Sequence, residues 1–543
     1  MSRKHSMKKQ YSIYVFLFVT FALATGWAQA GDSQQPADSS QQPADAGLQP
    51  GAPAPALGPD NTAAQTIENP PLSGLDQPAL EPGLGARSFL IPGLHVLDTA
   101  DTDLSGSLVG KDPVRSVTRV LGSLALQRLW KNYDLDVEYA GGAALYENFS
   151  RTAAQIHALN VDQRIRWRTG QVSFRDSFSD LPEGIFGYAD FGGAGGYDLG
   201  GFGNVGGLQD AGGGSFFSAG QYGSLGQNPR ITNTSLVEMT QLLNPRSSFT
   251  LTGSYGLTDF IDNSSVDCTP STTCCPPVGT CCPPATACCP PATNCCPAPT
   301  AADVSATPGC LINSHQFAFQ AGYNYQLSRR DQLALVYGYQ EFIYPVTTLG
   351  TFNTNHFHLL YGHRISGRMD LQIGGGPQIT TINPSTAAGN PPAARIRQIT
   401  GTGRASLRYR FPRTTLNASY DRLATNGSGF FGGATTNVAR FEVTRPLSRL
   451  WTISGDVGYA HNTRLLPSFT PGAPNSFQNE YAGLGLRRQF GRYLGGYLTY
   501  QYTDLNFNVP VCSATDLTEC GRASQRHTII VGLDWHPRPI RID

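Results

Sequence analysis

The chain has 543 residues, of which 14% are charged and 10% aromatic. Soluble domains usually carry about 25% charged residues, so this chain is poor in charge for its length. Lys plus Arg and Asp plus Glu each number 39, and the resulting zero net charge excludes the basic composition of a nucleic-acid-binding protein. Many Gly (61), Tyr (23) and Phe (27), with only 4 Met, favour aromatic-rich β-strands joined by turns.

The first thirty residues have the pattern of an export signal. Four basic residues between Arg3 and Lys9 precede an apolar run from Tyr11 to Ala24, and residues 28–30, Ala-Gln-Ala, have the small-x-small form of a cleavage site. We therefore predict a signal peptide over residues 1–30. The alternative, an uncleaved membrane anchor, is disfavoured because the apolar run is shorter than the ~20 residues of a membrane-spanning helix.

Residues 31–93 have the composition of a linker. The stretch from Gly31 to Ala86 contains ten Pro and no Lys or Arg, and its Ser-Gln-Gln-Pro-Ala sequence occurs twice. Such a segment cannot bury enough apolar surface to offset its ordering entropy. We expect a disordered or extended spacer in the periplasm, with a partner-binding arm as the alternative.

From about residue 94 the chain alternates between apolar and polar side chains. Between Gln316 and Leu327, every second position is aromatic or apolar, and Gln, Asn, Ala and Gly fill the others; the aromatic and apolar series is Phe317, Phe319, Ala321, Tyr323, Tyr325 and Leu327. The stretches beginning at Phe249, Leu333 and Leu494 repeat this pattern, which is typical of β-strands with one apolar and one polar face. These strands reach ten or more residues, longer than the strands of soluble β-sandwiches.

The connections alternate between tight turns and longer loops, as in bacterial transmembrane barrels. We count seventeen strands joined in this way. The first of them, 116–130, ends in a tight turn and therefore runs toward the end of the barrel that carries the tight turns. An earlier strand must run the opposite way, and the candidate for it lies near His95 to Thr102. We therefore predict an all-β, transmembrane antiparallel barrel of about 18 strands, with 16 as the alternative. The predicted strands are 95–102, 116–130, 133–146, 155–168, 171–179, 231–242, 247–259, 315–328, 331–341, 354–365, 369–382, 395–411, 414–424, 434–446, 449–462, 477–490, 493–507 and 524–535.

Over residues 94–537 the chain resembles porin-like outer-membrane β-barrel proteins, without indicating a subfamily. The last strand, residues 528–535, places Ile529, Val531, Leu533 and Trp535 on its outer face, similar to the closing strand that the barrel-assembly machinery recognises in that family. Unlike that pattern, the chain continues past the aromatic residue into a tail, residues 538–543. The resemblance implies the outer membrane of a Gram-negative-type bacterium, contact with its lipid, and a homotrimer.

Two sets of charged side chains are predicted to line the lumen. If Ile165 and Trp167 face outward, the neighbouring arginines face inward and meet acids of the preceding strand; this ladder is Arg164, Arg166, Arg168, Asp136 and Glu138. A second set has only Asp421 as an acidic neighbour on the next strand and consists of Arg404, Arg408 and Arg410. Both sets can simply be lumen packing, but the second is the better candidate for a wall that favours anions or polar solutes.

The two longest connections are the predicted outer loops 180–230 and 260–312. The first is rich in Gly and aromatic residues and is either a constriction folded into the barrel or a surface loop. The second contains a seven-residue Cys-Cys-Pro-Pro repeat, which does not have the spacing of a zinc ribbon and is predicted to be an oxidised surface loop, with soft-metal capture as the alternative. The disulfide candidates are the pairs Cys268–Cys310 and Cys512–Cys520.

No motif in the sequence indicates catalysis or a cofactor. His356 and His358 share one face of a strand, but no nearby Cys or carboxylate completes a metal site, so we interpret them as lumen residues. The sequence contains no G-x-S-x-G or H-E-x-x-H motif. We expect neither an enzyme, nor a cofactor, nor a bound metal.

The favoured function is therefore a porin-like channel for the passive diffusion of small polar solutes, because a barrel of 18 strands is too wide for its side chains to fill. The alternatives are a surface-interaction or structural barrel with a blocked lumen, and a pore for polymer export. An outer-membrane enzyme is a minority interpretation.

Overall fold

The computed structural model describes most of the predicted barrel and one short segment before it. The described residues are 70–74, 88–102, 114–147, 153–182, 229–261, 312–345, 351–383, 395–425, 431–465, 474–512 and 520–542. They all belong to one compact unit, Pro53–Asp543. The signal peptide, most of the linker, nearly all of loops 180–230 and 260–312, and Cys268 and Cys310 lie outside the described residues. Among the residues described, no helix is long and apolar enough to cross a membrane.

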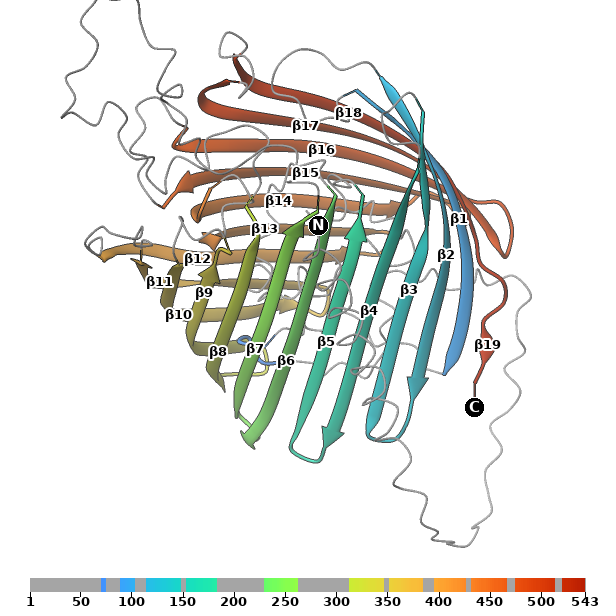
Figure 1. Ribbon diagram of the computed structural model, residues 1–543. Coiled ribbons are helices and arrows are strands. Elements are labelled where there is room, and N and C mark those ends of the chain that lie inside the picture. The colour runs from blue at the N-terminus through green and yellow to red at the C-terminus, as the bar shows by residue number, and fades with distance from the viewer. Residues whose placement is uncertain are drawn as a thin grey trace, which may run out of the picture. The chain divides into compact units, whose positions relative to one another are not determined.

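Eighteen long antiparallel strands form a single closed sheet (Figure 1). Each strand pairs with the next along the chain, and β1 pairs with both β2 and β18, which closes the barrel. This confirms the predicted 18-stranded barrel, and the 16-stranded alternative is wrong. The strands are β1 (Phe89–Asp101), β2 (Arg115–Leu129), β3 (Tyr133–Tyr146), β4 (Ala153–Trp167), β5 (Gly170–Leu181), β6 (Arg230–Asn244), β7 (Ser247–Phe260), β8 (Ser314–Gln326), β9 (Asp331–Ile343), β10 (Thr351–Ser366), β11 (Met369–Asn383), β12 (Ile396–Phe411), β13 (Thr414–Thr425), β14 (Ala434–Pro446), β15 (Trp451–Arg464), β16 (Ser476–Gln489), β17 (Leu494–Cys512) and β18 (Cys520–Trp535).

The boundaries differ from expectation at both ends of the barrel. β1 begins at Phe89, inside the stretch 31–93 assigned to the linker, because β2 extends far enough for Gln127 to pair with it. A two-residue strand, β19 (Ile540–Arg541), lies in the predicted tail and pairs with the start of β1. The alternating pattern is weak in both places, since Pro92 and Gly93 interrupt it within β1, and Pro537 and Pro539 come directly before β19.

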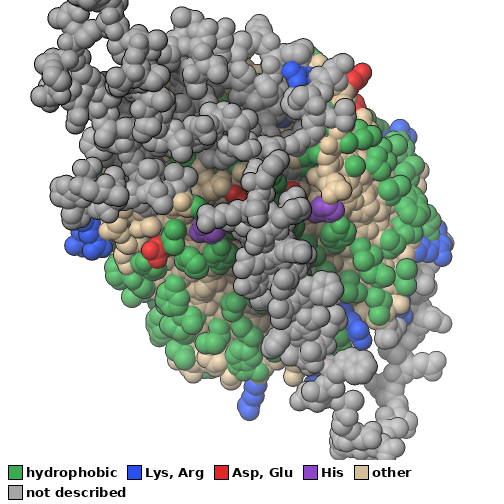
Figure 2. All heavy atoms as spheres, viewed as in Figure 1, with side chains coloured by type: hydrophobic (Ala, Val, Ile, Leu, Met, Phe, Trp, Pro, Cys, Tyr) green, Lys and Arg blue, Asp and Glu red, His purple; other side chains and the backbone are tan. Residues whose placement is uncertain are grey.

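The two faces of the strands differ in the way the alternation predicts. On β8, Phe317, Phe319 and Tyr323 are exposed on the outer face, while Gln316 and Gln320 are buried on the inner one. Figure 2 shows hydrophobic side chains gathered over the outer face of the strands, with Lys and Arg side chains mainly along the periphery of that view. An apolar band on the outside of a closed barrel is the arrangement that a lipid bilayer requires.

Tight turns lie at one end of the barrel and long connections at the other. The strands from β2 onward are joined in pairs by turns of a few residues, such as Lys131-Asn132 between β2 and β3 and Arg368 beside Gly367 between β10 and β11. In bacterial barrels the short turns are periplasmic. We call the end that carries them the turn end.

Ion pairs and hydrogen bonds hold the lumen side of the closing seam. The guanidinium of Arg526 on β18 donates from Nε to both carboxylate oxygens of Asp101 on β1, each at 2.9 Å. Arg487 Nη2 of β16 lies 2.8 Å from Asp534 Oδ2 of β18. Charged side chains excluded from the lipid face are thus paired inside, and the Asp101–Arg526 pair also links the first strand to the last.

Candidate functional site

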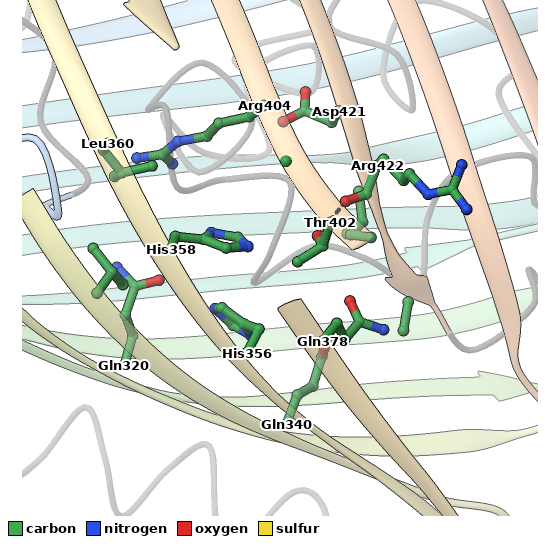
Figure 3. A pocket seen from close by; sticks show the side chains of 14 residues that line it. Gln320, Gln340, His356, His358, Leu360, Gln378, Thr402, Arg404, Asp421 and Arg422 are labelled. Atoms are coloured by element: carbon green, nitrogen blue, oxygen red, sulfur yellow. Dashed lines mark hydrogen bonds between the residues drawn. The ribbon is translucent and has the colours of Figure 1, made fainter. Parts of the chain in front are cut away.

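The lumen wall from β8 to β13 contains a shallow pocket that opens into the lumen (Figure 3). Nine of its fourteen lining residues have polar side chains, and these come from six successive strands. Its lining is built by strand residues, most of them at inward-facing positions, and by no loop that the structure describes. The lining residues are Gln320, Val336, Gln340, His356, His358, Leu360, Gln378, Thr402, Gly403, Arg404, Asp421, Arg422, Leu423 and Ala424.

Two neighbouring histidines of β10 form one side of this pocket. The ring centroids of His356 and His358 are 4.5 Å apart, and the two ring planes are tilted by 38°. The ring of His356 rests on Gly338 of β9, where any Cβ would come closer than 3.0 Å to it. Nε2 of His358 is buried without a hydrogen-bond partner among the described residues. Among those residues there is also no group of three side chains that could hold a metal ion.

Arg404 of β12 extends along the same pocket. It lies opposite Asp421 of β13 in the backbone register, and Figure 3 shows its guanidinium reaching toward Leu360. Its Nη2 donates a hydrogen bond of 2.9 Å to the backbone carbonyl of Leu72, a residue of the short segment that precedes the barrel. The arginine therefore presents a positive charge and a hydrogen-bond donor to whatever occupies this part of the lumen.

The other two arginines predicted for this wall lie nearer the turn end. Arg408 pairs with Asp370 of β11, with Nη2 3.1 Å from Oδ1. Arg410 lies opposite Thr415 of β13. The sequence-based prediction considered only the acids of β13, the partner strand in the hairpin, and it missed Asp370 because that residue lies across the other edge of β12. The wall is thus less unbalanced in charge than expected.

The first predicted set lies on β3 and β4, with different pairings from those expected. Arg166 pairs with Asp134 at 2.7 Å, and Arg164 is buried with its Nη2 4.0 Å from Asp162. Asp136 lies opposite Asp162, and Glu138 opposite Asn160, so neither acid faces an arginine directly. Arg168 is exposed in the turn that follows β4.

Asp162 also lies 3.3 Å from Nε of Arg175 on β5, which the sequence-based prediction missed. Asp134, Asp162 and Arg175 each occupy inward positions of the alternating pattern, and that signal would have identified them. The structure brings the two predicted sets to different stretches of the wall, β3–β5 and β11–β13.

The least expected contributor is the segment Pro70–Gly74. It lies in the stretch predicted to be a spacer, yet Ser73 is fully buried against lumen-facing side chains of β7 and β8. In Figure 1 it is the short blue ribbon beside these strands. Two prolines followed by Leu, Ser and Gly are a turn signal, but the same stretch contains other Pro-Gly pairs, so the sequence does not single out this turn.

Cys512 and Cys520 are directly opposite each other in the pairing of β17 with β18. This register is compatible with the predicted disulfide, since opposite residues of antiparallel strands have the Cα separation that a disulfide needs.

No protein-family model matches the chain. No curated protein matches it either. Solved structures similar to it include the Pseudomonas aeruginosa outer membrane protein OpdK, at 10% identity over 82% of this chain and 99% of that one, with a TM-score of 0.37. P. aeruginosa OccK2 (OpdF) in complex with glucuronate has 9% identity over 83% and 98%, with a TM-score of 0.38. The FrpB iron transporter of Neisseria meningitidis has 6% identity over 84% and 83%, with a TM-score of 0.35.

At such low scores and identities, the description of this chain as a closed barrel rests on its own strand pairing.

Proposed function

We propose that this chain is a porin-like outer-membrane channel for the passive diffusion of small polar solutes. The observation that carries the proposal is the closed 18-stranded barrel with an apolar outer face and a polar inner one. A barrel of this strand number is wider than its strand side chains can fill, and barrels of 16–18 strands leave an aqueous passage. The inner face supplies many side chains that can replace water around a polar solute, including Thr, Gln, Asn and Arg.

The wall around Arg404 favours solutes with carbonyl or anionic groups. The guanidinium is a strong donor with fixed geometry, and Gln320, Gln340 and Gln378 add amide groups beside it. Asp421 and the Arg408–Asp370 pair temper the positive charge, so the proposed preference is moderate.

The cellular setting follows from the same proposal. An export signal followed by a barrel with an apolar band fits the outer membrane of a Gram-negative-type bacterium, with lipid as the surrounding solvent and the barrel-assembly machinery as the insertion partner. A homotrimer remains part of the proposal by resemblance alone. The channel function requires neither a cofactor nor a catalytic residue.

A barrel with a blocked lumen, serving as a structural or surface-interaction protein, is the second candidate. It is favoured by the presence of Pro70–Gly74 on the lumen wall, where it occupies space that a solute would need. Polymer export has no specific observation in its favour.

Planar-bilayer recording on the purified chain separates the two. A channel gives stepwise conductance and a reversal potential that reports ion preference in a salt gradient. Absence of conductance in the intact chain, regained in a variant lacking residues 70–74, would favour the blocked barrel, and absence in both would reject the channel.

A further inference from the structure

Residues Pro71–Gly74 form a tight turn whose surroundings lie entirely on the lumen wall. The turn is closed by a hydrogen bond of 2.9 Å from the Gly74 amide to the Pro71 carbonyl. Pro before a turn and Gly at its end favour this geometry. A turn closed on itself directs its remaining backbone groups outward, and here these groups meet barrel side chains.

Ser73 makes a set of matched hydrogen bonds with β8. Its amide donates to Asn324 Oδ1 at 2.9 Å, while Asn324 Nδ2 donates to the Ser73 hydroxyl at 2.7 Å. The Ser73 carbonyl accepts a hydrogen bond of 2.7 Å from Gln320 Nε2. The Ser73 hydroxyl also bonds to the hydroxyl of Thr250 on β7. All polar groups of Ser73 are thus satisfied by the wall, which removes the cost of burying them.

Leu72 binds the wall on its other side through both backbone and side chain. Its carbonyl accepts hydrogen bonds from Arg404 Nη2 at 2.9 Å and from Gln372 Nε2 at 3.4 Å. Its side chain packs against an apolar patch of inward-facing residues, which consists of Ala334, Val336 and Leu360. An apolar patch facing the lumen would be unfavourable if it were exposed to water, and the leucine covers it.

Two glycines of the wall leave the room that the turn occupies. A Cβ on Gly322 of β8 would come closer than 3.0 Å to Ser73, and one on Gly362 of β10 would lie 2.5 Å from Leu72 Cδ2. Glycine is unfavourable in strand interiors unless another group approaches closely, so these positions fit a wall shaped around an occupant. By contrast, a Cβ on the lumen-facing Gly256 of β7 would find its nearest neighbour at 3.6 Å, an ordinary contact.

We propose that this wall is a binding site for a Pro-Leu-Ser-Gly turn, and that the chain's own Pro71–Gly74 docks there as a tethered plug that narrows the lumen. The occlusion part of this inference rests on the proposed channel function. Because turn and wall belong to one chain, docking is intramolecular, and a few hydrogen bonds with one leucine suffice to hold it.

The plug lies on the turn-end side of the pocket and shares residues with it. Thr250 lies near the tight turn that precedes β7, and Asn324 lies near the tight turn that follows β8. His356 and Gln378 lie farther toward the other end of the barrel. Arg404 and Gln320 line the pocket and also bind the turn. A solute that engages these two side chains competes with the docked turn for them.

Disulfide trapping in the full chain tests docking without reference to conductance. The Ser73→Cys and Thr250→Cys pair is oxidised mildly, and peptides are mapped by mass spectrometry for a disulfide between the two introduced thiols. The control combines Ser73→Cys with Thr499→Cys, because Thr499 is a buried residue of β17 with no contact to the turn. Linkage to position 250 and none to position 499 is expected. No linkage, or equal linkage to both, would overturn the docking site.

Conductance in planar bilayers tests occlusion. We expect two variants to raise the single-channel conductance because each empties the site. The first lacks residues 70–74, and the second, Gly322→Ala with Gly362→Ala, places methyl groups where the turn would lie. Gly256→Ala is the matched control and is expected to leave the conductance unchanged. The deletion leaves the wall intact and therefore covers the case in which the glycine pair fails to fold.

The outcomes separate the two proposals. An unchanged conductance after the deletion would overturn the plug. If no variant conducts although the trapped disulfide forms, the channel function fails while the docking site stands.

Discussion

Arg404 Nη2 donates a hydrogen bond of 2.9 Å to the carbonyl oxygen of Leu72, which is 332 residues away in the sequence. The same arginine lines the pocket and lies opposite Asp421. Its charge therefore acts both on the docked turn and on the pocket beyond it. Ion preference is the property through which this double role can be measured.

We expect Arg404→Gln to reduce the preference of the channel for anions. Removal of one positive charge within several ångströms of a passing ion in water is worth about 0.5–1 kcal/mol, which corresponds to roughly a two- to fivefold fall in the anion-to-cation permeability ratio. The reversal potential in a salt gradient measures this ratio. Arg413→Gln, at an exposed turn outside the lumen wall, is the control and should leave the ratio unchanged. Equal ratios for Arg404→Gln and the unaltered chain would contradict the assigned role.

The second prediction concerns the stability of the barrel at Gly376 of β11. A Cβ there would fall closer than 3.0 Å to the carbonyl oxygen of Phe357 on β10, a backbone atom that cannot rotate away. The two strands come this close beside Pro377, which has no amide to donate, and the pairing of β10 with β11 has a gap at this point. We expect Gly376→Ala to lower the free energy of unfolding by roughly 1–3 kcal/mol.

Urea unfolding of the barrel in detergent measures this change. Gly256→Ala is the control, since it adds the same methyl group to a lumen-facing position where the nearest atom is at an ordinary distance. If both variants unfolded at the same urea concentration, the close approach of β10 and β11 at Gly376 would be refuted.

The barrel could be predicted because each strand carries its own evidence. Alternation with a period of two, as in β8, needs no knowledge of the partner strand, and lipid on one side makes the pattern strict. The inward position of Arg404 followed from the same pattern. The pairing of Arg408 with Asp370 did not, because it depends on the register between β11 and β12, which are separated by a loop whose length sets no register.

The docked turn could not be predicted from composition. Residues 31–93 are dominated by Pro, Ala and Gln, and a window average conceals one leucine and one serine with specific partners. The bonds of Ser73 reach Asn324, 251 residues away, so no local period reports them. On the barrel side, the docked turn corresponds to glycines at lumen-facing positions, such as Gly322. Glycine occurs in strands for several other reasons, so these positions do not predict a docked segment.

The Asp101–Arg526 pair is expected to stabilise the closing seam. The Asp101 side chain is 1% exposed and that of Arg526 9%, so removing one partner leaves a buried charge without its counterion. Such a loss costs roughly 3–5 kcal/mol. We expect Asp101→Asn to lower the urea midpoint markedly, and the double variant Asp101→Asn with Arg526→Gln to recover part of the loss because no uncompensated charge remains. A double variant less stable than the single one would contradict this account.

Cys512 and Cys520 are expected to form a disulfide that ties β17 to β18. They are paired directly across the antiparallel strands, where Cα atoms lie about 4.5–5.5 Å apart, inside the range of about 4.4–6.8 Å that disulfides span. The loop they close is short, so reduction should cost roughly 2–3 kcal/mol of stability by the chain-entropy estimate. Mass mapping of non-reduced peptides should find the two cysteines linked, and Cys512→Ser with Cys520→Ser should abolish the effect of a reductant on the urea midpoint at this site. Free thiols at both positions in protein exported to an oxidising compartment would refute the disulfide.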